Sequence, residues 1–292
     1  MTRVGAMGWS LKEESRLQRN MRHILRKSKL TAISAVLVLC ILVVALFAPQ
    51  IATHDPLRGN FRSMLESPTG EHLFGTDELG RDIFSRVVYG ARISILIGLM
   101  ALAVGLIVGV TIGLLSGYFG GITDLVGMRF IDILLSFPGI LLAILISSTF
   151  GAGLFPVILA IGLYSVPTFS RVTRGSVLVV KETGYVEAAK AIGASIPRIL
   201  FRHILANILG PILVYSTLRM GSAVLTTAFL SFLGVGVSPP TPEWGLMVNT
   251  ARNFMREAPH VILFPGMAIF ATVLVFNLLG DGLRDLFDVK QQ

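Results

Sequence analysis

Residues 185–206 read YVEAAKAIGASIPRILFRHILA, and this stretch decides how the rest of the chain is organised. It is too polar to lie in hydrocarbon, although strongly apolar segments flank it on both sides. We expect two short helices joined by a break. The first ends at Gly193, a residue that tolerates the left-handed conformation of a helix stop. The second begins with Ser195 as N-cap and Pro197 in its first turn, where a missing N–H is harmless.

One face of this helical pair is predicted to be apolar. Six residues at helical spacing form it: Val186, Ala189, Ile192, Ile199, Leu200 and Ile204. Charged or polar side chains occupy the other positions, including Glu187 and Arg198. A helix pair with one apolar face, held between apolar segments, is typical of a part that binds another protein.

The composition indicates an all-α, polytopic membrane protein. Hydrophobic residues make up 53% of the 292 and charged residues only 14%, so the apolar side chains exceed what one soluble core could bury. Several runs approach the ~20 apolar residues that a membrane-spanning helix needs. The net charge of +8 is expected to set membrane topology, because basic residues mark the cytoplasmic side. We therefore expect contact with membrane lipid and no nucleic-acid partner.

Six transmembrane helices are predicted, at about 30–48, 93–117, 131–150, 154–168, 208–232 and 261–279. The basic residues 1–29 form a cytoplasmic N-terminal tail, in which 11–25 is a candidate amphipathic surface helix. The transmembrane domain occupies 30–292, and its loop 171–206 is cytoplasmic. Because the number of spans is even, both termini are expected in the cytoplasm. No signal-peptide cleavage is expected, so the first span remains as an anchor.

Two sequence features predict how the spans pack. Gly105, Gly109, Gly113 and Gly117 recur every four residues, so they share one helix face and allow another helix to approach closely. The pair Pro138–Gly139 falls inside the third predicted span and should kink it.

Motifs for chemistry are absent from the sequence. There is no GxxxxGK[ST] for ATP, no GxSxG and no HExxH; the histidines are scattered, and Cys40 is the only cysteine. We assign no catalytic, cofactor-binding or metal-binding residue and expect a transport subunit rather than an enzyme. The predicted spans hold almost no acids, which favours an external motor over ion coupling. An autonomous channel or ion-coupled carrier remains the alternative, and a membrane enzyme a weaker one.

A charged residue at membrane depth is costly and therefore usually functional. Arg219 falls inside the fifth predicted span, with Ser216 close by. One interpretation is that Arg219 and Ser216 line a solute pathway. The other is that Arg219 is a structural partner of an acid such as Asp281 or Asp285.

The cytoplasmic stretch resembles the EAA loop of ATP-binding-cassette (ABC) importer permeases. Glu187-Ala188-Ala189, three residues and then Gly193 fit the family pattern, while Ala206 stands where the family usually has proline. FGTDELGRDIFSRVVYGARIS (74–94) and LSFLGVGVSPPTPEWGLM (230–247) resemble the C-type permease subunit of dipeptide, oligopeptide, nickel and glutathione importers. GDGLRD (280–285), followed by FDVK, resembles the tail of that subunit.

This resemblance implies a heteromeric importer in a prokaryotic cytoplasmic (inner) membrane. Its partners would be a second, homologous permease subunit, two cytoplasmic ATPase subunits and an extracytoplasmic solute-binding protein. ATP and Mg²⁺ would be bound by the ATPases, with no cofactor in this chain. Glu187, Ala188, Ala189 and Gly193 would couple the permease to an ATPase. Dipeptides or oligopeptides are the expected cargo, with nickel, glutathione and opine-like solutes as alternatives.

The external segments 50–91 and 234–260 would help to receive the binding protein. Pro240 and Trp244 are candidates for a rigid contact at this surface. The same residues are also candidates for packing that closes the external mouth of the pathway.

Overall fold

The computed structural model describes residues 29–288, so the candidate surface helix within 11–25 lies outside the described residues. These residues form helices and loops, with one isolated antiparallel bridge between Thr76 and Asp82. The first helix, α2 (Lys29–Leu46), is strongly apolar, and its polar residues Lys29, Thr31 and Ser34 lie in its first two turns. The short α3 (Ala48–Ile51) follows it, with Pro49 in its first turn, where proline is tolerated.

A long helix, α4 (Ile83–Phe119), begins where Asp82 accepts a hydrogen bond from the Ser85 backbone N–H at 2.7 Å. It packs along α7 (Leu154–Val180). A Cβ atom on Gly109 would lie 2.7 Å from both the Phe169 Cβ and the Val166 carbonyl oxygen of α7. Cβ atoms on Gly105, Gly113 and Gly117 would likewise come too close to atoms of α7, which confirms the predicted close approach of another helix.

The third predicted span is broken rather than kinked. It consists of α5 (Gly121–Ser136) and α6 (Gly139–Phe150), which are bent by 86° at Phe137 and Pro138. Phe137 is extended, as expected for a residue before proline, and this interrupts the helical hydrogen bonds.

The sequence predicted a second short helix after the break at Gly193. In the structure, this segment is instead the start of the next long helix. After α8 (Gly184–Ala191), the turn α9 (Ile196–Arg198), a π-helical segment (Ile199–Leu205) and α10 (Ala206–Phe232) form one continuous helix from Ile196 to Phe232. The prediction of a separate short helix was therefore wrong. Ala206, which stands where proline is usual, keeps a backbone N–H and so allows the helix to continue.

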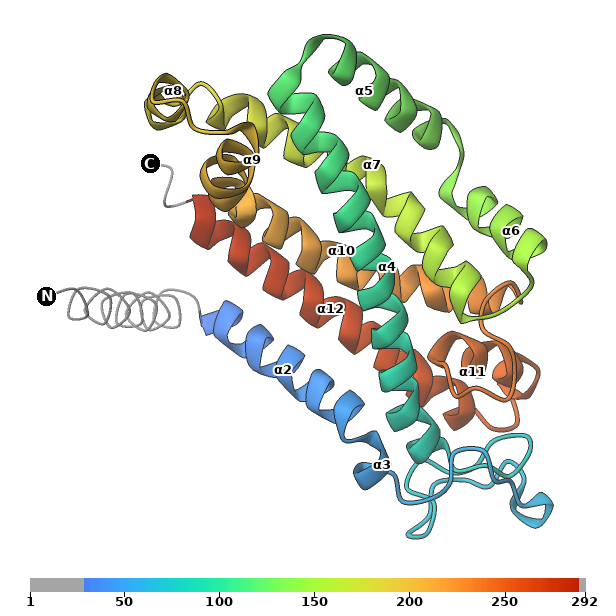
Figure 1. The fold of residues 1–292 in the computed structure, drawn as a ribbon. Helices are drawn as coiled ribbons and strands as arrows, with labels where there is room; N and C mark the ends of the chain where they lie inside the picture. Colours follow the sequence, from blue (N-terminus) through green and yellow to red (C-terminus); the bar gives the residue numbers. More distant parts are fainter. Residues whose placement is uncertain (1–28, 289–292) are drawn as a thin grey trace, which may run out of the picture.

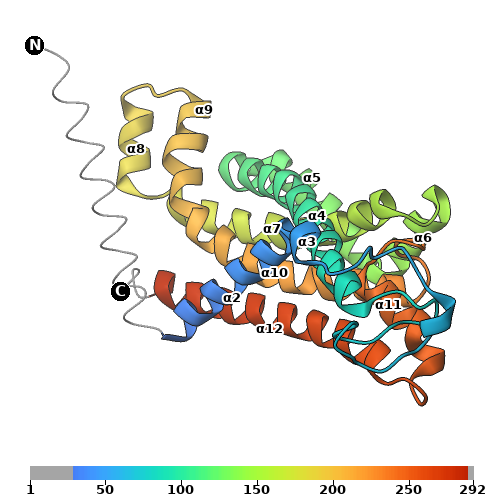
Figure 2. The same cartoon turned by 90° about the horizontal axis from the view of Figure 1, so that it is seen from below.

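The chain closes with α11 (Trp244–Ala251) and α12 (His260–Asp288). In Figure 1, α2, α12, α10, α4 and α7 form one bundle. Helices α8 and α9 protrude at one end, while α11 and the loop 52–82 lie at the other. The view in Figure 2 also sets α8 apart from the bundle. Short 3₁₀ turns lie at Phe61–Ser63 and Arg252–Phe254.

Five helices in the described part of the chain are long and apolar enough to cross a membrane, and the bent pair α5–α6 would be the sixth. Several helices extend past the predicted spans: α4 begins at Ile83, α7 continues to Val180 and α12 to Asp288. Since helices can project beyond the bilayer, the limits of the spans stay predictions.

Candidate functional site

A glycine cap at Gly193 ends α8 and turns the chain back towards the bundle. Its φ is +77°, in the left-handed region that glycine adopts without strain. The Ala194 N–H donates to the Ala189 carbonyl and the Gly193 N–H to the Lys190 carbonyl, both at 3.0 Å. This pair of bonds is the Schellman motif, so the predicted helix break is confirmed at this residue. Ser195 occupies the next N-cap position without a side-chain capping bond.

The inner face of α8 and the segment after it packs on the ends of α4 and α7. Five of the six predicted stripe residues are buried in one cluster with residues of α4, α7 and α10: Val186, Ala189, Ile199, Leu200 and Ile204 with Leu114, Val177, Ile208 and Ile212. The stripe was expected to face another protein, and for these five residues that prediction was wrong, because they pack inside the fold. Ile192, the sixth, stays available to a partner, since its side chain is 85% exposed. It caps α8 next to the turn at Gly193, where the chain leaves the helical register.

The outer face of α8 has no partner within the described residues. Glu187 and Ala188 are exposed, as are four large apolar side chains: Tyr185, Ile192, Ile196 and Phe201. A groove of about 640 Å³ runs between α8 and the following helix. We call it the coupling groove; it is lined by Tyr185, Ala188, Ala189, Ile192, Gly193, Ala194, Arg198, Arg202 and His203. Exposed apolar side chains around a groove are typical of a protein-binding surface.

Two lysines connect this element to the end of α4. The Lys190 ammonium lies 5.7 Å from the centre of the Tyr118 ring, within range of a cation–π interaction. The Lys181 ammonium donates to the Gly117 carbonyl at 3.1 Å. Lys190 is therefore a direct contact between α8 and the end of α4, and Lys181 joins the segment before α8 to the same end.

Arg219 on α10 contacts α7. Its guanidinium donates to the Thr168 hydroxyl, and its central carbon lies 5.6 Å from the centre of the Tyr164 ring. Within residues 29–288, no ion pair joins Arg219 to Asp281 or Asp285, so the alternative that made one of these acids its partner is not supported.

Ser216 is buried, and its hydroxyl donates to the Ile212 carbonyl at 2.7 Å within the same helix. The hydroxyl is therefore engaged within α10. A cavity of about 440 Å³ lies between the α5–α6 break, α7 and α10, and Ser216 is not among the residues that line it. Its lining is mostly apolar and includes Gly139, Ala143, Tyr164, Thr226 and Phe229. The pathway roles of Arg219 and Ser216 stay predictions.

Sequence reasoning missed Tyr164 and Thr168. These residues are four positions apart on α7 and therefore share a helix face. A search for polar side chains on one face of the proline-containing segment YSVPTFSR would have found them.

At the other end of the bundle, Trp244 lies inside the fold. It is 2% exposed, and its indole N–H donates to the Val87 carbonyl at 2.8 Å. Its ring fills the space beside Gly90, where a Cβ atom would come within 2.5 Å. Trp244 thus fixes α11 to α4, whereas Pro240 is exposed and accessible to a partner.

The fully buried Glu243 caps the N-terminus of α11. Its carboxylate accepts hydrogen bonds from the Gly245 and Leu246 backbone N–H groups at 2.9 and 2.8 Å. The Ser94 hydroxyl of α4 donates to the same carboxylate at 3.3 Å. Burial raises the pKa of Glu243, and the hydrogen bonds offset part of that increase.

Comparison with protein families identifies the group to which this architecture belongs. Residues 109–291 match the family described as "Binding-protein-dependent transport system inner membrane component". The chain belongs to this family. Residues 15–68 of the permease also match the "N-terminal TM domain of oligopeptide transport permease C". It is therefore a multi-pass inner-membrane permease subunit of ABC importers, as the EAA loop and the two longer motifs predicted.

Similar permeases cover almost the whole chain. The glutathione transport system permease protein GsiD of Pectobacterium atrosepticum is 45% identical over 92% of this permease and 89% of its own length. GsiD of Escherichia coli is 47% identical over 91% and 88%. The dipeptide transport system permease protein DppC of Alkalihalophilus pseudofirmus is 44% identical over 92% and 88%.

Solved structures share the fold at low identity. The MetNI methionine ABC transporter in an inward-facing conformation matches with a TM-score of 0.56 and 20% identity, over 69% of this permease and 96% of the other chain. An amino acid ABC transporter solved with histidines matches with a TM-score of 0.52 and 15% identity, over 68% and 92%.

Proposed function

We propose that this permease forms one half of the translocation pathway of an ATP-driven importer for small peptides, with dipeptides and glutathione as the leading cargo. It pairs with a second, homologous permease subunit and receives cargo from a solute-binding protein outside the cytoplasmic membrane. Two cytoplasmic ATPase subunits bind ATP and Mg²⁺ and drive the cycle. Both termini of the permease lie in the cytoplasm.

The coupling groove is the observation that carries this proposal. Ala188 is small and exposed, so a helix or loop of an ATPase can approach the backbone of α8 closely, while Gly193 permits the turn that ends this helix. The exposed Ile192 and Phe201 supply apolar area, and Glu187 supplies a charge for a basic group of the motor. A groove of this composition on an otherwise membrane-embedded chain fits a soluble protein partner.

The contacts behind the groove provide a route from motor to pathway. The inner face of α8 is packed against α4, α7 and α10 through the buried cluster around Val186 and Ile204. Close-packed interiors transmit displacement rather than absorb it. A push on α8 would therefore tilt α7 and α10, the two helices that hold Tyr164 and Arg219 beside the cavity.

The choice of small peptides rests on the relatives and on the chemistry around Arg219. The curated relatives are named for glutathione and dipeptides, solutes that carry carboxylates. A guanidinium can bind a carboxylate in bidentate fashion. Arg219 is half-buried, and the Tyr164 ring that it contacts lines the apolar cavity, so a carboxylate bound there would be little screened by water.

Uptake in reconstituted vesicles tests the proposal. The permease is co-purified with its partners, reconstituted, and supplied with binding protein and either a labelled dipeptide or labelled glutathione. Import that requires ATP and persists when ion gradients are collapsed supports the proposal. Flux carried by the isolated chain, without ATP, would contradict it and indicate a channel or carrier. A preference for one labelled solute decides the cargo.

A further inference from the structure

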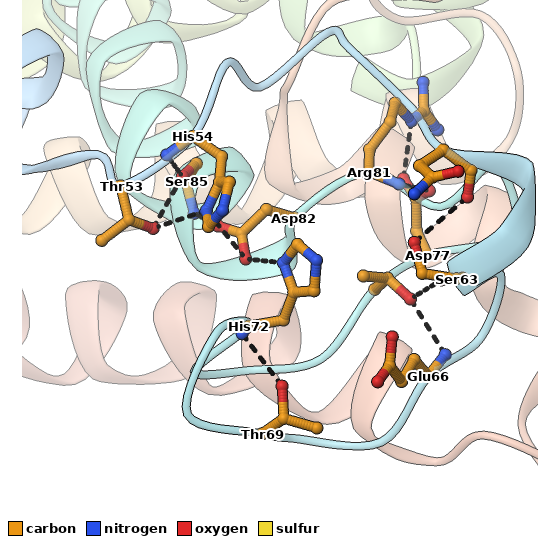
Figure 3. A network of polar contacts seen from close by, with 12 residues as sticks. Thr53, His54, Ser63, Glu66, Thr69, His72, Asp77, Arg81, Asp82 and Ser85 are labelled. Carbon is orange, nitrogen blue, oxygen red and sulfur yellow. Dashed lines mark hydrogen bonds and ion pairs between the residues drawn. The ribbon is translucent and has the colours of Figure 1, made fainter.

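The loop 52–82, at the end of the bundle opposite α8, brings two histidines together. The imidazole centroids of His54 and His72 are 4.7 Å apart, with their planes inclined by 37°. One candidate ligand atom from each histidine and one from the Glu71 carboxylate all lie within 4.8 Å of one another. Figure 3 shows the two imidazoles next to each other, beside Asp82. Eighteen positions separate the two histidines in sequence (72 − 54), so this cluster is produced by the fold.

Asp82 orients His72. One carboxylate oxygen lies 2.9 Å from the His72 Nδ1, and the other accepts from the Ser85 backbone N–H at 2.7 Å. The Asp82 side chain is only 1% exposed, so it is fixed between the loop and the start of α4. With Nδ1 bound to Asp82, the nitrogen of His72 that remains for a ligand is Nε2. Among the described residues this Nε2 has no hydrogen-bond partner.

His54 is held in a similar way. Its backbone N–H donates to the Ser85 hydroxyl at 2.9 Å, and its Nδ1 lies 3.0 Å from the Thr53 hydroxyl. These contacts fix the ring close to His72 and leave its Nε2 without a hydrogen-bond partner in residues 29–288. Both histidines are partly exposed and Glu71 is exposed, so an ion can reach the cluster from solvent.

We propose that His54, His72 and Glu71 bind one divalent transition-metal ion, of the zinc or nickel type. Imidazole nitrogen with carboxylate oxygen is a ligand set that suits these ions. A carboxylate on the second nitrogen of a ligating histidine, as Asp82 is on His72, fixes the ring and increases its basicity.

The distances require only a small adjustment. Donor atoms on a tetrahedral zinc ion lie roughly 3.3–3.5 Å apart, given metal–ligand distances of about 2.0–2.2 Å. The three atoms lie within 4.8 Å of one another, so each pair must close by at most about 1.5 Å, and the exposed Glu71 side chain can rotate to do so. Three protein ligands leave a fourth position for water or for an incoming ligand. A bound ion would tie the segment after α3 to the segment before α4.

Metal titration of the full chain tests this inference. The chain carries an affinity tag without histidine, is purified with the subunits that accompany it, and is stripped with a chelator. Zn²⁺ and Ni²⁺ are then titrated separately by calorimetry, and bound metal is measured by mass spectrometry of the elements. The variants are Glu71→Gln and the double variant His54→Gln/His72→Gln. Glu66→Gln, which changes an exposed acid of the same loop outside the cluster, is the matched control.

For at least one of the two metals, we expect the wild type to bind about one more ion per chain than the double variant does. Glu71→Gln should weaken binding by about tenfold or more, since loss of even an outer contact to a metal site weakens affinity about 10–100-fold. Glu66→Gln should bind metal as the wild type does. Ions held by accompanying subunits cancel in the comparison between variants.

Two results would overturn the inference. One is that the double variant binds as many ions per chain as the wild type does, and the other is that Glu71→Gln binds metal with unchanged affinity. If the double variant fails to fold, Glu71→Gln decides alone, because its side chain is exposed and has no partner in the described chain. Melting of the metal-free proteins verifies that this variant is folded.

Discussion

The guanidinium carbon of Arg219 on α10 lies 5.6 Å from the centre of the Tyr164 ring on α7. The same ring packs against Gly139 at the start of α6, where a Cβ atom would come within 2.4 Å of it. It also lines the 440 Å³ cavity. One aromatic residue therefore connects the arginine on α10, the break between α5 and α6, and the cavity wall.

Replacement of Arg219 tests its role in the pathway. Arg219→Ala should reduce peptide uptake by roughly tenfold or more, as loss of about 1.4 kcal/mol of solute binding would do. Arg219→Lys should retain part of the activity, since the charge remains without the bidentate geometry. Tyr164→Phe should resemble the wild type, because a cation–π contact uses the ring face. Uptake and co-purification of partners are measured together. Loss of the assembled complex in Arg219→Ala would instead show a structural role.

The contact between α4 and α7 should be intolerant of bulk at Gly109. Gly109→Val places methyl groups where the Phe169 Cβ and the Val166 carbonyl already lie, and should destabilise the protein by about 1–3 kcal/mol. Gly175→Ala on α7 is the control, because its Cβ would meet no described atom within 4 Å. Thermal unfolding in detergent is the measurement. Equal midpoints for the two variants would refute the proposed packing.

Substitution at Gly193 should separate backbone strain from loss of contacts. A Cβ atom there meets no described neighbour within 4 Å, so any penalty arises from the φ of +77° alone. An L-residue in this conformation costs about 1–2 kcal/mol, and asparagine tolerates it best. We expect Gly193→Val to reduce bound ATPase and uptake, with membrane insertion intact, and Gly193→Asn to retain both. If Gly193→Val transports normally, the turn is not part of the coupling.

The pKa of Glu243 gives a pH dependence of stability. Because burial raises this pKa, the folded protein holds the proton more tightly than the unfolded chain does. The contribution of this group is therefore present at low pH and is lost as the pH rises from about 4.3, the usual glutamate pKa, through the folded value. Glu243→Gln should show a smaller fall in unfolding temperature over this range. An identical pH profile in the variant would contradict the shift.

Much of the fold follows from local rules that the sequence displays. The glycines at 105, 109, 113 and 117 predicted a close helix contact, which α7 supplies. Gly193 predicted the end of α8, because few other residues adopt its conformation. Both features depend on residues close together in the chain.

What the sequence did not reveal depends on contacts between distant segments. Arg219 meets Thr168 and Tyr164 rather than an acid, which only the packing of α10 on α7 determines. The histidines at 54 and 72 looked scattered, yet the start of α4 brings them together through Asp82. The sequence predicted a short helix after Ser195 and a separate span from 208, because the charged stretch between them suggested a surface element, whereas one helix runs from Ile196 to Phe232.

The most direct test of the central claim is a purification of the tagged chain in mild detergent, followed by mass spectrometry of its partners. The wild type is compared with Ala188→Trp, which fills the coupling groove at an exposed position. We predict that the wild type brings down stoichiometric P-loop ATPase and a second permease, while Ala188→Trp keeps the permease and loses the ATPase. A wild-type chain that purifies alone, stable and homogeneous, would contradict the account.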